Sequence, residues 1–100
     1  MWFTENRGNR IGRIDMSASI TEFLIPTLNS YPEGMVSGPG GAMWFTEFVG
    51  NKVGRINLAG VISEIPVPTP DSWPADVTWD SKTLWFTEWQ GNKIGAIRPG

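Results

Sequence analysis

The chain has 100 residues, 40% hydrophobic and 18% charged, which is usual for a globular protein. Its net charge of −2 argues against a nucleic-acid partner, because such partners need a concentrated basic face. It contains no cysteine and no histidine, which excludes a disulfide, a thiolate metal site and any Ser-His-Asp or Cys-His catalytic group.

A four-residue motif, Trp-Phe-Thr-Glu, occurs three times and sets the period of the chain. Its copies begin at Trp2, Trp44 and Trp85, so the steps are 42 (44 − 2) and 41 (85 − 44) residues. A period of about 40–45 residues built from short β-type segments is typical of β-propeller blades. One blade is an open sheet whose two apolar faces must be covered by neighbouring blades. The chain is therefore predicted to be an all-β fragment of a propeller, with about two and a half four-stranded antiparallel blades.

The second copy shows the predicted strands most clearly. Residues 43–48 are aromatic and β-branched and form a first strand, followed by a tight Gly-Asn turn. Residues 52–56 form the next strand, where Gly54 indicates the close approach of another backbone or a large ring. Residues 61–67 contain proline, which cannot donate to a strand ladder, so this strand is placed at a sheet edge. Residues 77–79 form the short inner strand of the next blade.

This order of strands predicts a single partial propeller domain over residues 1–100, made of three blade pieces. Residues 1–30 lack the inner strand of their blade, residues 31–72 form a complete blade, and residues 73–100 lack the edge strand. Met1 occupies the position that Met43 holds in the next copy, so we expect the chain to be an internal part of a longer propeller.

The motifs W-F-T-E, G-N-[KR]-[IV]-G-R-I, I-[ST]-E-[FI] and P-x-P-T together closely resemble the streptogramin B lyases, also called virginiamycin B lyases. The resemblance covers essentially the whole chain. It implies a seven-bladed ring. It also implies a carbon–oxygen lyase that inactivates a cyclic depsipeptide antibiotic by magnesium-dependent elimination at its ester bond, an antibiotic-resistance activity.

The resemblance also implies where an active site would lie. In the family, an E-P-H-G segment supplies a metal-binding glutamate and a histidine general base, and a second metal-binding glutamate follows in the W-F-T-E strand. The matching segment here is Tyr31-Pro32-Glu33-Gly34, with Glu47 fourteen residues (47 − 33) after Glu33. Tyr31 stands at the position of the first glutamate and Glu33 at that of the histidine. Glu33 and Glu47 are thus the candidate Mg²⁺ ligands, no catalytic residue is assigned, and no cofactor is certain.

A structural interpretation competes with this one. Glu5, Glu47 and Glu88 occur once in every copy, so each can serve its blade by accepting a hydrogen bond from backbone or a neighbouring arginine. Glu33 can equally be a solvated surface residue. Tyr31 and Trp73 share one position, which favours packing beneath the loop over stacking on a ligand.

We expect a partial lyase-type propeller that is inactive alone because it has no histidine. The alternative is a non-catalytic module that associates with itself into a ring and acts as a binding scaffold. Its partners would be the rest of the propeller or other copies of itself, and a small cyclic peptide as ligand. No apolar run approaches 18 residues and no leader opens the chain, so we expect no membrane partner and a cytoplasmic, bacterial-type location.

Overall fold

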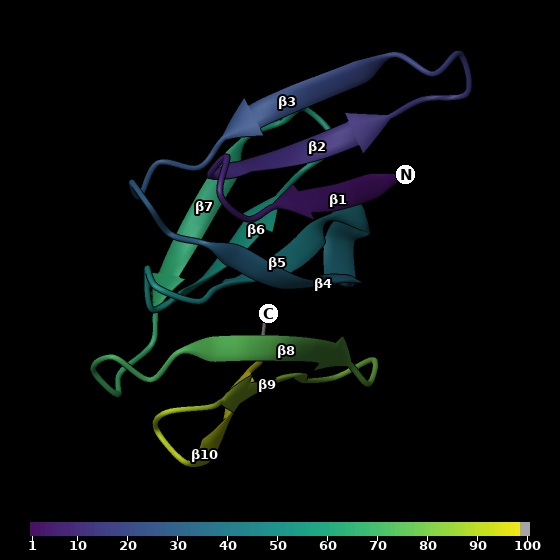
Figure 1. The fold of residues 1–100 in the computed structure, drawn as a ribbon. Helices are drawn as coiled ribbons and strands as arrows, with labels where there is room; N and C mark the ends of the chain where they lie inside the picture. Colours follow the sequence, from purple (N-terminus) through teal and green to yellow (C-terminus); the bar gives the residue numbers. More distant parts are fainter. Residues whose placement is uncertain (99–100) are drawn as a thin grey trace.

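The computed structural model describes residues 1–98, which form ten strands in three antiparallel sheets. The sheets have three, four and three strands, in the orders β1-β2-β3, β4-β5-β6-β7 and β10-β9-β8. Figure 1 shows the first sheet above the second and the third below it. The innermost strands are neighbours, since β4 contacts β1 on one side and β8 on the other. The predicted all-β propeller fragment of about two and a half blades is confirmed.

The strands are short and joined mainly by tight turns. In chain order they are β1 (Trp2–Glu5), β2 (Arg10–Ile14), β3 (Ile20–Leu24), β4 (Pro32–Ser37), β5 (Met43–Glu47), β6 (Lys52–Ile56), β7 (Ile62–Pro66), β8 (Pro74–Trp79), β9 (Leu84–Glu88) and β10 (Lys93–Ile97). A 3₁₀ turn, Pro39–Gly41, lies between β4 and β5. Within residues 1–98, no helix has the length and apolar character needed to cross a membrane.

Proline positions explain where strands begin and where a sheet stops. The proline-bearing strand β7 lies at the edge of the second sheet, as its missing ladder donor predicts. The inner strand β8 begins at Pro74, three residues earlier than predicted. A register shift between Pro74 and Val77 lets the strand accommodate its first residues without losing the pairing to β9. A proline is tolerated as the first residue of a strand, so β8 and β4 both start with one.

The core consists of two apolar clusters, each between two sheets. The first and second sheets enclose Ile11, Ile25, Phe45 and Ile56, and the second and third enclose Trp44, Val53, Val67, Leu84 and Phe86. Successive side chains of a strand point to opposite faces, so Trp44 of β5 faces one neighbouring sheet and Phe45 faces the other. The four-stranded sheet is therefore covered on both faces.

A glycine in each of the strands β2, β6 and β10 makes room for a phenylalanine ring of the preceding strand. A Cβ on Gly54 would lie 2.2 Å from the ring of Phe45, which is closer than real contacts allow. Gly12 and Gly95 meet their own phenylalanines in the same way. The close approach of a large ring predicted at Gly54 is confirmed.

An asparagine in the β1–β2 hairpin and one in the β5–β6 hairpin each tie three segments of the chain together. Asn51 donates to the carbonyls of Val67 (3.4 Å) and Thr69 (2.9 Å), and accepts from the backbone N–H and the hydroxyl of Ser72 (3.0 and 2.7 Å). Asn9 makes the equivalent bonds one repeat earlier. Both residues have a left-handed backbone (φ 58° and 57°), which asparagine tolerates better than most residues. We call Asn9 and Asn51 the asparagine clamps; each joins an edge strand to the start of the next sheet.

Candidate functional site

The segment predicted to carry the site enters β4 beside the β5–β6 hairpin. Tyr31 has a left-handed backbone (φ 53°), and its carbonyl accepts the N–H of Phe48 (3.0 Å). Trp73 repeats this arrangement, with φ 55° and a 3.1 Å bond from the N–H of Trp89. Bulky residues rarely adopt this conformation unless the surroundings hold them in it. The neighbouring hairpin thus fixes the backbone of the predicted site segment.

Glu33 lies in the irregular part of β4, where the register with β5 shifts between Pro32 and Met35. Its side chain is exposed, and its Oε1 accepts a hydrogen bond from Nδ2 of Asn6 (2.8 Å). The carbonyl of Glu33 accepts a bond from the hydroxyl of Thr4 (3.2 Å). Glu33 is therefore attached through both its side chain and its backbone to the first sheet.

The threonine of the W-F-T-E motif connects successive inner strands. Thr46 accepts the N–H of Gly34 (3.0 Å) and donates to the carbonyl of Ala75 (2.6 Å) in β8. A Cβ on Gly34 would lie 2.5 Å from that same carbonyl, so the two inner strands approach closely here. Thr4 and Thr46 thus each bind the inner strand of the following sheet. They set the spacing between β1, β4 and β8, where the three sheets meet.

Glu47 is fully buried, and its carboxyl group faces that of Glu64 on β7. Neither oxygen of Glu47 receives a hydrogen bond from an N–H or hydroxyl group of the described residues. Burial, a hydrogen bond to Glu64 and the negative charge of Glu64 raise the pKa of Glu47 to about 9, against the opposing effect of Lys52. At neutral pH Glu47 is therefore a carboxylic acid, and its proton makes the bond to Glu64.

The hydrogen-bond donor that the sequence predicted for Glu47 is wrong. A backbone group or a neighbouring arginine was expected to donate to it, but Arg55, the arginine of the adjacent strand β6, lies opposite Trp44 and over its ring, 5.9 Å from the centroid. The acceptor and donor are instead two carboxyl groups sharing one proton, which lets a buried acid remain uncharged.

The same arrangement occurs one repeat earlier. Glu5 faces Glu22, which raises the pKa of Glu5 by a hydrogen bond, with burial and the charge of Glu22 acting in the same direction. We call Glu5 with Glu22, and Glu47 with Glu64, the acid pairs. In the third sheet Glu88 is buried and its Oε1 has no partner among the described residues. A role repeated in successive blades supports the structural interpretation of the W-F-T-E glutamates.

These residues do not by themselves fit a magnesium site. In residues 1–98, no group of three or more Asp, Glu, His or Cys side chains is placed to hold a metal ion. Mg²⁺ binds ionised carboxylates, and the proton on Glu47 opposes such binding. The structure brings Glu47 to Glu64 and Glu33 to Asn6. Glu33 and Glu47 as a ligand pair stay a prediction.

Three aromatic rings cluster at the hairpin tips of the second and third sheets. Trp73 lies 5.0 Å from Phe48 and 5.7 Å from Trp89, measured between ring centroids. This contact is the packing expected for Trp73, although Tyr31 at the equivalent position is 39% exposed. Trp89 is 68% exposed, so the cluster forms an apolar surface at these hairpin tips.

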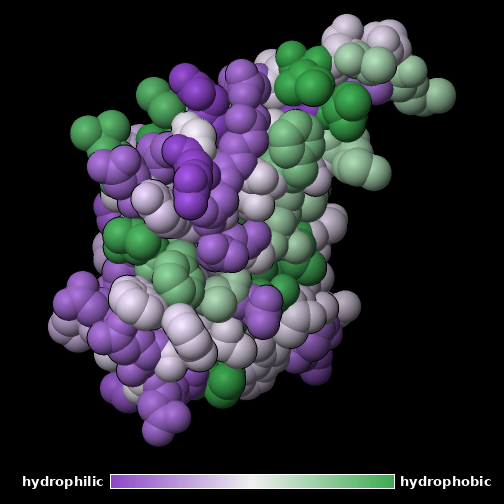
Figure 2. Space-filling model, in the orientation of Figure 1, coloured by the Kyte–Doolittle hydropathy of each residue, from purple (hydrophilic) through white to green (hydrophobic). Residues whose placement is uncertain are grey.

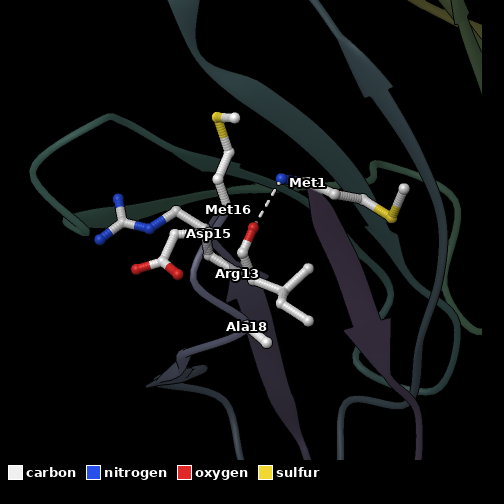
Figure 3. A pocket seen from close by; sticks show the side chains of 6 residues that line it. Met1, Arg13, Asp15, Met16 and Ala18 are labelled. Atoms are coloured by element: carbon white, nitrogen blue, oxygen red, sulfur yellow. Dashed lines mark hydrogen bonds between the residues drawn. The ribbon is translucent and has the colours of Figure 1, made fainter.

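A wide hollow of about 570 Å³ lies at the free side of the first sheet (Figure 3). It is lined by Met1, Arg13, Ile14, Asp15, Met16 and Ala18, and the N-terminal amine donates to the carbonyl of Ile14 (2.9 Å). Met1 and Ile14 hold the repeat positions of Met43 and Ile56, which pack against the preceding sheet. Figure 2 shows apolar side chains among polar ones at this upper end of the molecule. The hollow is thus a sheet face without its neighbour, and its lining suggests no catalytic group.

Sequence reasoning missed the residues that join the sheets: Glu22 and Glu64, the asparagine clamps, and the two threonines. The sequence did contain a sign of the glutamate pairs, because Glu22 and Glu64 each follow a W-F-T-E glutamate by 17 residues (22 − 5 and 64 − 47). Their contact depends on the register across the intervening strand, which opposes Gly12 to Glu22 and Gly54 to Glu64.

Comparison with known proteins gives one consistent answer. The virginiamycin B lyase family matches residues 1–100. The catalytically inactive virginiamycin B lyase of Staphylococcus aureus, a histidine-to-alanine variant solved with quinupristin, is 50% identical with a TM-score of 0.95. Its selenomethionine-substituted form gives the same identity and score, and a streptogramin B lyase structure is 41% identical with a TM-score of 0.86. A search of the curated proteins found no match.

The matches cover 98–99% of this chain but only 34–37% of the lyases, so the chain spans about a third of their length. The three sheets, the repeated W-F-T-E strands and the family match over residues 1–100 all indicate the same family. The chain belongs to the virginiamycin B lyase family.

Proposed function

We propose that this chain is a scaffold part of a streptogramin B lyase propeller. The parent enzyme would open cyclic depsipeptide antibiotics by magnesium-dependent elimination at the ester bond. The observation that carries the proposal is the 50% identity and TM-score of 0.95 to a virginiamycin B lyase over 99% of the chain. The chain alone would be inactive, because it has no histidine, whereas the lyase solved with quinupristin was made inactive by replacing one.

The residues of this chain would act by positioning. Thr4 and Thr46 hold the inner strands at a fixed spacing, and the contact with Glu64 keeps Glu47 uncharged within its sheet. A bound Mg²⁺ would supply Lewis-acid stabilisation of developing negative charge in the elimination. Glu33 and Glu47 would serve as its ligands only if other groups completed the site and the proton of Glu47 were displaced.

A chimera tests this role. The aligned third of the Staphylococcus aureus lyase is replaced by this chain, once unchanged and once with Tyr31→Glu and Glu33→His, which restores the E-P-H-G segment. Ring opening of quinupristin is then measured with Mg²⁺. If the unchanged chimera or the restored one is active, the chain serves as a lyase scaffold. If both fold, by circular dichroism, and neither is active, the proposal fails. Turnover by the isolated chain would also contradict it.

A second candidate is a module that associates with itself into a ring and acts as a binding scaffold. It is favoured by the two uncovered sheet faces at the ends of the arc. Trp85 and Ile94 are 40% and 65% exposed on the last sheet, and Met1 and Ile20 are 86% and 60% exposed on the first. In the second sheet, Trp44 and Val53 hold the repeat positions of Trp85 and Ile94, and there both pack against the following sheet. Exposed apolar faces of this kind promote association.

Light scattering distinguishes the two candidates. A monomer at micromolar concentration excludes the ring-forming module and leaves the rest of a propeller as the partner. A discrete oligomer that also binds a small cyclic peptide would favour the module. A cytoplasmic, bacterial-type location remains a proposal, tested by cell fractionation.

A further inference from the structure

The ladder between β4 and β5 does not hold residues 33–34. Pro32 and Met35 have regular partners on β5, and the two residues between them share a single opposite position, that of Thr46. Two residues against one make a β-bulge, a feature that is frequent beside active sites. The peptide group that joins residues 33 and 34 therefore needs hydrogen-bond partners from outside the ladder.

Two threonine hydroxyl groups supply these partners. The hydroxyl of Thr4 on β1 donates to the carbonyl of Glu33 (3.2 Å), and the hydroxyl oxygen of Thr46 on β5 accepts the N–H of Gly34 (3.0 Å). This carbonyl and this N–H belong to one peptide group, so the group is held at both of its ends. Its rotation would break both bonds, and the two threonines therefore fix its orientation. We call these two contacts the threonine clamp.

The next inner strand repeats the arrangement. Ala75 and Asp76 lie in the corresponding register shift of β8. The carbonyl of Ala75 accepts the hydroxyl of Thr46 (2.6 Å), and the N–H of Asp76 donates to the hydroxyl oxygen of Thr87 (3.0 Å). Thr46 thus accepts from one clamped peptide group and donates to the next. Hydrogen bonds in such a chain polarise and strengthen one another.

Asn6 adds contacts that the next strand lacks. Its Nδ2 donates to the carbonyl of Pro32 (3.1 Å) and to Oε1 of Glu33 (2.8 Å). Phe48 holds the repeat position of Asn6 in the second sheet, and its side chain has no hydrogen-bond donor. The threonine clamp therefore fixes the backbone at position 33, and Asn6 directs the side chain that this backbone carries.

We propose that Thr4 and Thr46 are positioning residues for the side chain at position 33. The family's histidine base is expected at this position, so the inference rests on the proposed function and deepens it. In a lyase propeller, the peptide group after the base would be held by two W-F-T-E threonines, one from the preceding blade and one from its own. Such positioning matters because a displacement of about 1 Å can lower a rate about 100-fold.

NMR of the isolated full chain tests the N–H end of the clamp. In Thr46→Val the amide proton of Gly34 should shift upfield, since its acceptor is lost, whereas Thr46→Ser should keep the original shift. Thr87→Val is the matched control, and it should shift the amide proton of Asp76 while leaving that of Gly34 in place. An unchanged Gly34 amide in Thr46→Val, or equal shifts of both amides in Thr87→Val, would overturn the proposal.

Thr4→Val tests the carbonyl end of the same peptide group. Thr4 is only half-buried, so this substitution leaves the apolar core intact. The carbonyl carbon of Glu33 should shift upfield when its donor is lost, and that of Ala75, which Thr46 binds, should not. An unchanged Glu33 carbonyl would contradict the role of Thr4, whether or not Thr46→Val folds.

The chimera with Tyr31→Glu and Glu33→His tests the consequence for catalysis. Adding Thr4→Val should lower kcat for ring opening of quinupristin about tenfold or more and leave KM nearly unchanged, because the base is displaced while the substrate still binds. Thr4→Ser should recover most of the loss. Thr21→Val, at an exposed position of β3, should change neither constant.

Failure of this inference is distinguishable from failure of the proposed function. An unchanged kcat with Thr4→Val, or activity in the chimera without the two restoring substitutions only, would overturn the positioning role and leave the proposed function standing. If neither chimera is active, the proposed function fails, and the shifts at Gly34 and Glu33 alone decide whether the threonine clamp exists.

Discussion

The acid pair in the central sheet predicts an unusual dependence of stability on pH. Glu47 has a pKa of about 9 in the folded chain and an ordinary value of 4.5 when exposed. Because the folded pKa is the higher one, folding takes up a proton between these values. The stabilising contribution is complete below about pH 4.5 and is lost as the pH rises towards 9. Unfolding should therefore become easier with rising pH across the neutral range.

The size of the effect follows from one proton. A single group that is protonated when folded and ionised when unfolded changes the free energy of unfolding by about 1.4 kcal/mol per pH unit. From pH 6 to pH 8 the loss is about 3 kcal/mol, a large part of the stability of a small domain. The raised pKa of Glu5 acts in the same direction. The lowered pKa values of Asp15 and Asp80 act only at acid pH, below this range.

The assay is urea unfolding followed by tryptophan fluorescence at several pH values. Glu47→Gln removes the titrating group and keeps its shape. The slope of the variant's unfolding free energy against pH should therefore be smaller by the contribution of about one proton. At pH 8 the variant's unfolding free energy should exceed that of the original chain. Glu33→Gln is the matched control, since Glu33 is exposed and its substitution should leave the slope unchanged. If Glu47→Gln and the original chain show the same slope between pH 6 and 8, the shared proton does not exist.

Three substitutions test the contacts that join the sheets, each by its free energy of unfolding. Thr46→Val should cost about 2 kcal/mol, because it leaves two backbone groups at the inner strands unpaired. Gly54→Ala should cost about 1–3 kcal/mol, since its Cβ would overlap a phenylalanine ring, whereas Gly8→Ala, with its nearest contact at 3.4 Å, should be tolerated. Asn51→Ala should cost about 2–3 kcal/mol through its lost bonds, and Asn92→Ala should be nearly neutral. Equal losses of unfolding free energy for Gly54→Ala and Gly8→Ala, or for Asn51→Ala and Asn92→Ala, would contradict the roles given to Gly54 and Asn51.

Much of the fold was predictable because the same pattern of strands and turns follows each of the three W-F-T-E copies. The strand at residues 52–56 was predicted with its observed bounds, since a Gly-Asn turn and a second turn delimit it. Proline placed β7 at the edge correctly. The start of β8 was missed because a register shift allows a strand to continue through residues that do not alternate.

The site was less predictable, because it depends on contacts between strands that are not adjacent in sequence. Glu47 was expected to serve its blade through a hydrogen bond, and it is fully buried there. Its partner is Glu64, on the strand beyond its immediate neighbour, and that contact needs both the register and the small size of Gly54. Single-sequence patterns describe which face a residue occupies but not which distant residue shares that face.

The central claim is that each sheet depends on neighbours packed against both of its faces. Hydrogen exchange of the backbone amides tests it most directly, since exchange reports the local free energy of opening. The covered central strands β5 and β6 should exchange most slowly, and β10, with an open edge and an uncovered face, much faster. If the amides of β10 are protected as strongly as those of β5 and β6, the sheets do not stabilise one another and the account is wrong.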